Sequence, residues 1–174
     1  MVMQNTKTLA AAWRYSAVGC ALALMGIALV APSVYAAPPS AAECRKLNPA
    51  GRDSGGDTNF SLAVRDRKMD VVTAMIGCGA DVNLKTQEGW TPLHTAAYYG
   101  PAAMIDLLVS KGAQVNARGN YDGWTPLHMA ASADKDAAVV QALLKAGADK
   151  TLKSQSGKTA REMAAKADIQ ALLK

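Results

Sequence analysis

The six residues from Gly89 to His94 read GWTPLH, and the same letters return from Gly123 to His128, 34 positions later. In both copies, one further residue and then an Ala pair follow the His. Self-similarity at a period of roughly 20–50 residues indicates a repeat architecture, in which each unit is a small supersecondary element stacked on its neighbours. These two copies therefore decide the fold.

A second shared segment closes each unit. We align Leu107–Leu108 and the following Gly112 with Leu143–Leu144 and Gly147, and Ala follows the Gly in both cases. The pattern of an apolar run that ends at a Gly is typical of a helix whose C-terminal residue adopts the left-handed conformation. Each unit is thus predicted to contain a second helix.

Weaker copies flank the two full ones. A degenerate copy begins at Thr58, 33 residues before Thr91, and reads TNFS in place of TPLH, with Phe60 at the Leu position. A truncated copy begins at Gly157 and ends with Leu172–Leu173. The repeats therefore extend over most of the chain that follows residue 57.

The chemistry of the repeated block explains its first helix. Thr91 and Thr125 are suitable N-cap residues, because their side chains can accept a hydrogen bond from a free amide of the first turn. Pro92 and Pro126 then fit the first helical position, where no amide partner is lost. No helix pair of this length buries both of its faces, so each pair must stack on its neighbours. We expect four Leu residues to form one apolar spine along the stack. They are Leu93, Leu108, Leu127 and Leu144.

A Thr-Pro-Leu-His-x-Ala-Ala block at this period resembles the ankyrin repeat, and the resemblance covers roughly residues 53–174. It implies an all-α solenoid of about three full repeats plus a truncated C-terminal repeat. Ser40 and Glu43 have the spacing of a capping box, so we also expect an N-terminal capping helix through about Leu47. The predicted organisation is a cap and loop over residues 37–57 and a repeat domain over residues 58–174.

Residues 1–36 have the features of a secretory signal. Lys7 and Arg14 precede an uncharged apolar run over residues 17–31, and small residues lead up to Ala36. A run of this length is short for a membrane span, and we expect cleavage after Ala36. An uncleaved membrane anchor is the alternative. Cleavage predicts a periplasmic protein with no membrane contact of its own.

Composition and motif content argue against catalysis, cofactor binding and nucleic-acid binding. Loss of Lys7 and Arg14 lowers the formal net charge from +5 to +3, which is too small to indicate a nucleic-acid partner. No recognisable nucleophile, metal or phosphate-binding motif is present. The two His residues of the chain, His94 and His128, are expected to bond to the capping Thr and to the backbone of the next turn, and not to a metal ion.

Cys44 and Cys78 are the two cysteines that remain after cleavage. An even pair in an exported protein favours a disulfide, here between the capping helix and the first repeat. A metal-binding or redox-active pair is the alternative, but the CxxC spacing typical of such pairs is absent.

The resemblance also implies a binding surface, because variable positions of the ankyrin register precede Thr-Pro and follow Ala-Ala. Five of the six aromatic residues beyond residue 36 fall at such positions, and aromatic side chains are enriched at protein interfaces. Trp before Thr-Pro also packs on the adjacent turn, which is an alternative role for both Trp residues. The predicted protein-binding residues are Arg65, Gln87, Trp90, Tyr98, Tyr99, Tyr121, Asp122, Trp124 and Ser132.

These observations predict a monomeric, non-catalytic binding protein exported to the bacterial periplasm. The resemblance to secreted bacterial ankyrin proteins suggests a protein partner that is supported or regulated, such as a periplasmic catalase. The alternatives are an immunity protein that neutralises a toxin and a secreted effector directed at a host. A metal-dependent enzyme built on the repeats is the least favoured class.

Overall fold

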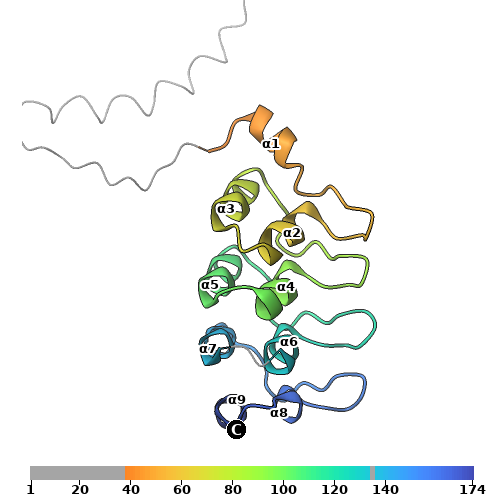
Figure 1. Ribbon diagram of the computed structural model, residues 1–174, viewed down its shortest axis with the longest axis vertical. Coiled ribbons are helices and arrows are strands. Elements are labelled where there is room, and N and C mark those ends of the chain that lie inside the picture. Colours follow the sequence, from red (N-terminus) through yellow and green to blue (C-terminus); the bar gives the residue numbers. More distant parts are fainter. Residues whose placement is uncertain (1–37, 134–135) are drawn as a thin grey trace, which may run out of the picture. The chain divides into compact units, whose positions relative to one another are not determined.

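The computed structural model describes residues 38–133 and 136–174, so the predicted signal segment lies outside the described part of the chain. Residues Pro38–Lys174 form one compact unit (Figure 1). Within the described residues the secondary structure is helical, apart from two isolated β-bridges. The helices are α1 (Ala41–Leu47), α2 (Asn59–Arg65), α3 (Met69–Gly77), α4 (Pro92–Tyr99), α5 (Ala102–Ser110), α6 (Pro126–Ser132), α7 (Ala137–Lys145), α8 (Ala160–Met163) and α9 (Ala167–Leu172).

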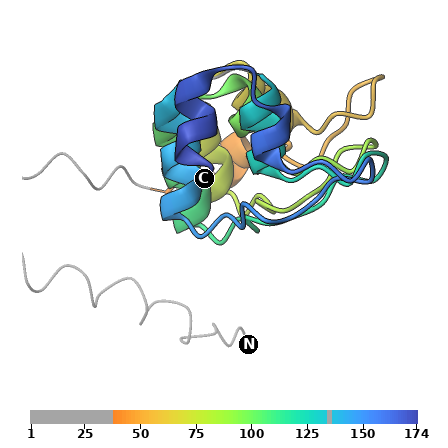
Figure 2. The ribbon, with the colours of Figure 1, turned by 90° about the horizontal axis from the view of Figure 1, so that it is seen from below.

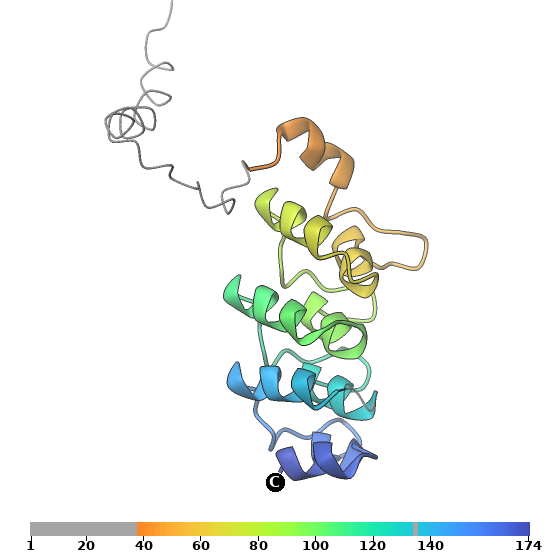
Figure 3. The same cartoon turned by 60° about the vertical axis from the view of Figure 1, so that its left-hand side comes forward.

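The helices form two parallel columns, as the predicted all-α solenoid requires. The shorter first helices stack as α2 on α4, α4 on α6 and α6 on α8, and the second column holds α3, α5, α7 and α9 (Figures 1 and 3). Long loops leave the first column on one side, and the view along the stack shows them projecting together away from the helices (Figure 2). The loops therefore meet the first helices at an angle, and the same angle recurs in successive units along the stack.

The helix ends confirm the local chemistry expected from the sequence. Thr91 and Thr125 are the N-cap residues of α4 and α6, and Pro92 and Pro126 are the first helical residues. After α5, Gly112 has a φ of +89°, in the left-handed region that an L side chain rarely adopts. Gly79 after α3 and Gly147 after α7 have the same left-handed conformation, and at each of the three positions the backbone turns into the next loop.

The apolar spine corrects one position of the sequence alignment. Leu93, Leu108 and Leu127 are buried, but Leu144 is half-buried, and its neighbour Leu143 is fully buried. The backbone amide after each closing Gly identifies the equivalent residues: Ala113 donates to the carbonyl of Leu108, and Ala148 donates to that of Leu143, both at 3.0 Å. Leu143 is therefore the counterpart of Leu108, because an extra residue between α6 and α7 moves the register.

The two histidines join neighbouring repeats. The Nδ1 atom of His94 accepts the backbone N–H of Thr91 at 3.1 Å, and its Nε2 atom lies 3.0 Å from the carbonyl oxygen of Trp124 in the next loop. His128 repeats this arrangement with the N–H of Thr125 and the carbonyl of Lys158. Each Nδ1 atom also lies within 2.9 Å of the hydroxyl of the capping Thr, so each imidazole bonds to the Thr of its own unit and to one carbonyl of the following unit.

A column of basic side chains, which the sequence analysis did not identify, links the loops. Arg52 donates to the carbonyl of Lys85 at 2.8 Å, Lys85 to that of Arg118 at 3.1 Å, and Arg118 to that of Lys153 at 2.9 Å. Each cation therefore satisfies a carbonyl group in the loop below it. These bonds hold the loops in register along the stack.

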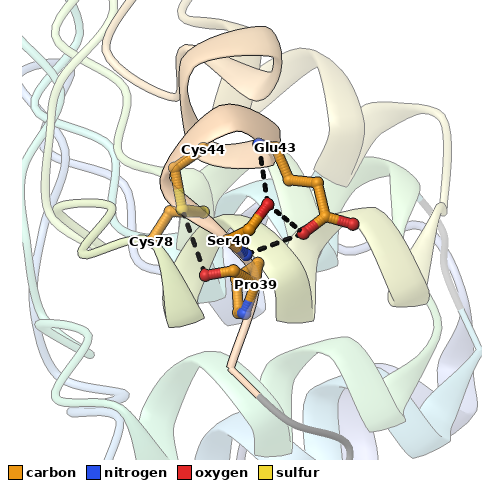
Figure 4. Close-up of a disulfide and its surroundings, with 5 residues drawn as sticks. All are labelled: Pro39, Ser40, Glu43, Cys44 and Cys78. Atoms are coloured by element: carbon orange, nitrogen blue, oxygen red, sulfur yellow. Dashed lines mark hydrogen bonds between the residues drawn. A yellow bond between two sulfur atoms is a disulfide. The ribbon is translucent and has the colours of Figure 1, made fainter.

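The N-terminal cap has the predicted form. Ser40 and Glu43 make the reciprocal bonds of a capping box at the start of α1, and Asn48 ends the helix in the left-handed conformation. Cys44 of α1 and Cys78, which follows α3, form a disulfide (Figure 4). No residue of α1 is fully buried, and α1 is attached to the first repeat by the disulfide and by the half-buried Leu47, which packs against the hydrophobic core.

Candidate protein-binding surface

Two adjoining clefts lie in the angle between the loops and the first helices. Eight of the nine residues predicted to bind a protein line one or both of them. Some come from the loops before α4 and α6, and others come from the C-terminal ends of α2, α4 and α6. We call the surface formed by both clefts the concave surface.

The larger cleft has a volume of about 460 Å³ and lies between the second and third repeats. Its lining residues are Trp90, Tyr98, Tyr99, Asp122, Trp124, Met129 and Ser132.

The aromatic residues of this cleft differ in how they are held. Trp90 and Trp124 are half-buried and pack against the hydrophobic core, so part of each side chain has a structural role. Tyr98 and Tyr99 are each 37% exposed, and their rings meet edge to face with centroids 4.7 Å apart. The tyrosines therefore present apolar area and hydroxyl groups to the solvent on a fixed support.

The loop before α6 brings Asp122 to the edge of the larger cleft. One carboxylate oxygen of Asp122 accepts the backbone N–H of Trp124 at 2.9 Å, which fixes the side chain. Gly119 lies beneath, where a Cβ atom would come within 3.0 Å of that oxygen and 3.2 Å of Trp90. The absence of a side chain at Gly119 thus lets Trp90 and Asp122 approach each other.

The smaller cleft, of about 110 Å³, continues the surface toward the first repeat and shares Trp90 and Tyr99 with the larger one. Arg65 lies at its wall and pairs with Asp57 at 3.3 Å. Gln87 belongs to the opposite loop, where its backbone N–H bonds to the preceding loop. The predicted residues from separate repeats are therefore brought together along one surface.

Tyr121 is the predicted residue that lines neither cleft. Its side chain is 74% exposed and belongs to the loop beside Asp122. A partner seated on the concave surface would reach Tyr121 only by extending over the loop edge.

Seven lining residues are not among the predicted ones: Gly55, Asp57, Ser61, Thr86, Glu88, Thr95 and Met129. Thr95 and Met129 are buried residues that nevertheless contribute to the walls of the smaller and larger cleft, respectively. Both occupy the variable position between His and the Ala pair of the repeated block. Variation at that one position, Thr in one copy and Met in the next, is the signal that identifies them.

The histidines lie below this surface with both ring nitrogens engaged. Burial lowers the pKa of His94 to about 4, because the charged imidazolium loses its hydration, and burial also lowers the pKa of His128. Protonation of the imidazole would put a hydrogen on Nδ1, and this hydrogen would face the backbone N–H of Thr91 or Thr125 that Nδ1 now accepts. Among the described residues, no group of three or more His, Cys, Asp or Glu side chains is placed to hold a metal ion.

No helix within residues 38–133 and 136–174 combines the length and apolar character needed to cross a membrane.

Comparison with known protein families matches this chain to a family model. The family model described as ankyrin repeats (3 copies) matches residues 60–154. Similar stretches occur in an ankyrin repeat-containing protein of Schizosaccharomyces pombe, which is 35% identical over 60 residues, or 34% of this chain and 29% of that protein.

Two further relatives show the same partial overlap. The Notch-regulated ankyrin repeat-containing protein of Xenopus tropicalis is 36% identical over 56 residues, covering 32% of this chain and 49% of the relative. Protein phosphatase 1 regulatory subunit 12A of Mus musculus is 39% identical over 54 residues, covering 31% of this chain and 5% of the relative. The matched stretches thus span less than half of each of these three relatives.

Proposed function

The chain belongs to the ankyrin-repeat family, and on that premise we propose that it is a non-catalytic module of the bacterial periplasm that holds one protein partner on its concave surface. Ankyrin repeats make it a protein–protein interaction module. Its action on the partner is rigid surface complementarity, with no chemical turnover.

The aromatic cleft carries the proposal. Two Trp and two Tyr side chains from separate repeats meet around one hollow of about 460 Å³, and both Tyr rings are exposed to solvent. Aromatic residues in such positions supply large contact areas at a low entropic cost, and they dominate binding energies at protein interfaces. A contiguous aromatic hollow on a small solenoid supports use by a macromolecule.

Export is supported by two independent features. Residues 1–36 read as a signal segment, and a disulfide joins Cys44 to Cys78. Disulfides persist in oxidising compartments such as the periplasm and are rare where thiols are kept reduced. The partner is then a periplasmic protein, and the resemblance to secreted bacterial ankyrin proteins favours an enzyme such as a catalase. A relative named as a regulatory subunit of a phosphatase supports a role in binding enzymes.

The proposal is tested by affinity capture from a periplasmic extract, with the immobilised protein as bait. The double variant Tyr98→Ala/Tyr121→Ala is compared with the wild type and with Asp106→Ala/Lys111→Ala, which changes exposed residues at α5. We expect the wild type and the α5 variant to retain the same partner and the tyrosine variant to lose it.

Thermal melting of the variants separates binding from folding. All three proteins should melt at similar temperatures, because the substituted side chains lie outside the core. Equal capture by the tyrosine variant would reject the concave surface as the binding site. Recovery of the protein in the cytoplasmic fraction, and not in an osmotic-shock fraction, would reject export.

A further inference from the structure

The larger cleft carries one charged group among its lining residues. That group is Asp122, and the remaining walls are aromatic, apart from Met129 and Ser132. The arrangement brings a carboxylate and four aromatic side chains together at one hollow. A carboxylate beside aromatic rings favours some ligand chemistries over others. The cleft therefore indicates which group of a protein partner it could bind.

Asp122 keeps capacity to bind a ligand. One oxygen accepts the Trp124 N–H, while the side chain forms no ion pair within the described part of the chain. Arg118 lies in the same loop, but its guanidinium group donates to the carbonyls of Lys153 and Gly123. Arg118, the cation nearest in sequence, therefore forms no ion pair with Asp122.

Elementary electrostatics decides which ligand fits. The face of an aromatic ring carries partial negative charge and attracts a cation within about 6 Å of its centroid. A carboxylate beside such rings adds a full opposite charge, whereas an anion would be repelled by both. An uncharged apolar group would fill the hollow but would cover the charge of Asp122 and leave only the Trp124 N–H to stabilise it, which is costly.

We propose that this cleft binds a cationic side chain, lysine or arginine, presented by the partner polypeptide. The inference rests on the proposed function, because it specifies what the partner inserts at the concave surface. The cation lies among the rings of Trp90, Tyr98 and Trp124 and pairs with the carboxylate of Asp122. The hollow of about 460 Å³ has room for either head group together with its aliphatic stem.

The test uses small probes and leaves the partner out. The blocked amino acids N-acetyl-lysine methylamide and N-acetyl-arginine methylamide are titrated into the purified protein, next to their uncharged analogues made from norleucine and citrulline. Binding is followed through the NMR signals of the indole N–H groups of Trp90 and Trp124, assigned with Trp90→Phe and Trp124→Phe. We expect at least one cationic probe to shift both signals at millimolar concentration, with its uncharged analogue binding about fivefold to tenfold more weakly.

A matched pair of variants isolates the charge. Asp122→Asn retains the oxygen that accepts the Trp124 N–H and removes only the charge, while Asp106→Asn makes the same change on the exposed face of α5. We expect Asp122→Asn to weaken binding of the cationic probe about fivefold or more and Asp106→Asn to leave it unchanged. If Asp122→Asn fails to fold, Tyr98→Leu serves instead, because it removes a ring face and retains apolar volume.

The outcomes separate this inference from the proposed function. Equal binding of charged and uncharged probes, equal affinity of the two Asn variants, or no shift with any probe would each overturn the cation site. None of these results bears on whether the tyrosine variant loses its partner in the capture experiment. Conversely, selective cation binding together with unchanged capture would reject the proposed function and leave the cation site standing.

Discussion

His94 shows how one side chain serves both the local helix and the stack. Its Nδ1 atom accepts the Thr91 amide, so the neutral ring donates from Nε2 to the carbonyl of Trp124. The imidazolium form has no acceptor and cannot satisfy that amide. Burial, which removes the hydration of the charged imidazolium, is the main reason why the pKa of His94 falls to about 4.

A pH-dependent stability follows from the histidines. An unfolded His titrates near pH 6.5, so between about pH 6.5 and 4 the unfolded chain binds more protons than the folded one. Stability is therefore complete above this window and falls as pH is lowered through it, by up to about 3 kcal/mol for His94. Urea unfolding at a series of pH values measures the loss. A free energy of unfolding that stays constant from pH 6.5 to 5 would contradict it.

The leucine register gives a second prediction at this scale. Leu143 is buried and Leu144 is half-buried, so Leu143→Ala should cost about 2–5 kcal/mol, and Leu144→Ala should cost clearly less. Denaturant unfolding of the two variants measures the difference. An equal loss of unfolding free energy in the two variants, or a larger loss for Leu144→Ala, would indicate that Leu144 and not Leu143 is the counterpart of Leu108.

At the scale of elements, α1 is joined to the first repeat by a disulfide and by the packing of one half-buried side chain, Leu47. It buries no residue of its own, and a hollow of about 300 Å³ lies between it and α3, lined in part by Leu47 and Val71. The first repeat that it covers also lacks a histidine bridge, because Ser61 bonds only to Thr58 of its own unit. The first repeat thus lacks the imidazole bridge of the next two repeats, and its cap contributes no fully buried residue.

Removal of the disulfide should weaken the attachment of α1. Cys44 and Cys78 are separated by 34 positions, and in the chain-entropy model closure of such a loop contributes about 3–4 kcal/mol. We expect Cys44→Ser/Cys78→Ser to lose a similar amount on denaturant unfolding and to be cleaved by trypsin at Arg45 or Lys46. If α1 in this variant resists trypsin as it does in the wild type, packing holds the cap, and the account of α1 is wrong.

Local sequence predicts the elements better than the contacts between them. Helix starts, closing glycines and the capping box depend on neighbouring residues, so the positions of Thr91, Gly112 and Ser40 suffice to predict them. The basic column through Arg52, Lys85 and others depends on loops brought together from separate repeats, and no local pattern indicates it. The alignment of Leu144 with Leu108 was wrong because it relied on the likeness of two Leu pairs. The position of the Gly that ends each helix gives the correct register.

For the whole molecule, stacking turns these local units into one extended surface. Most of the candidate site was predictable, since the repeat register places Trp90, Tyr98 and Trp124 on the side of the loops. The contribution of Thr95 and Met129 and the position of Asp122 beside Trp90 depend on side-chain packing between repeats, which a single sequence does not specify.

The central claim is that a partner protein occupies the concave surface, and hydrogen exchange tests it most directly. Amide exchange of the protein is compared alone and in complex with its captured partner, peptide by peptide. We expect slower exchange in the complex over residues 86–99 and 119–132, with no change in α5 and α7. Slower exchange confined to α3, α5, α7 and α9 would place the partner on the opposite face and contradict the account.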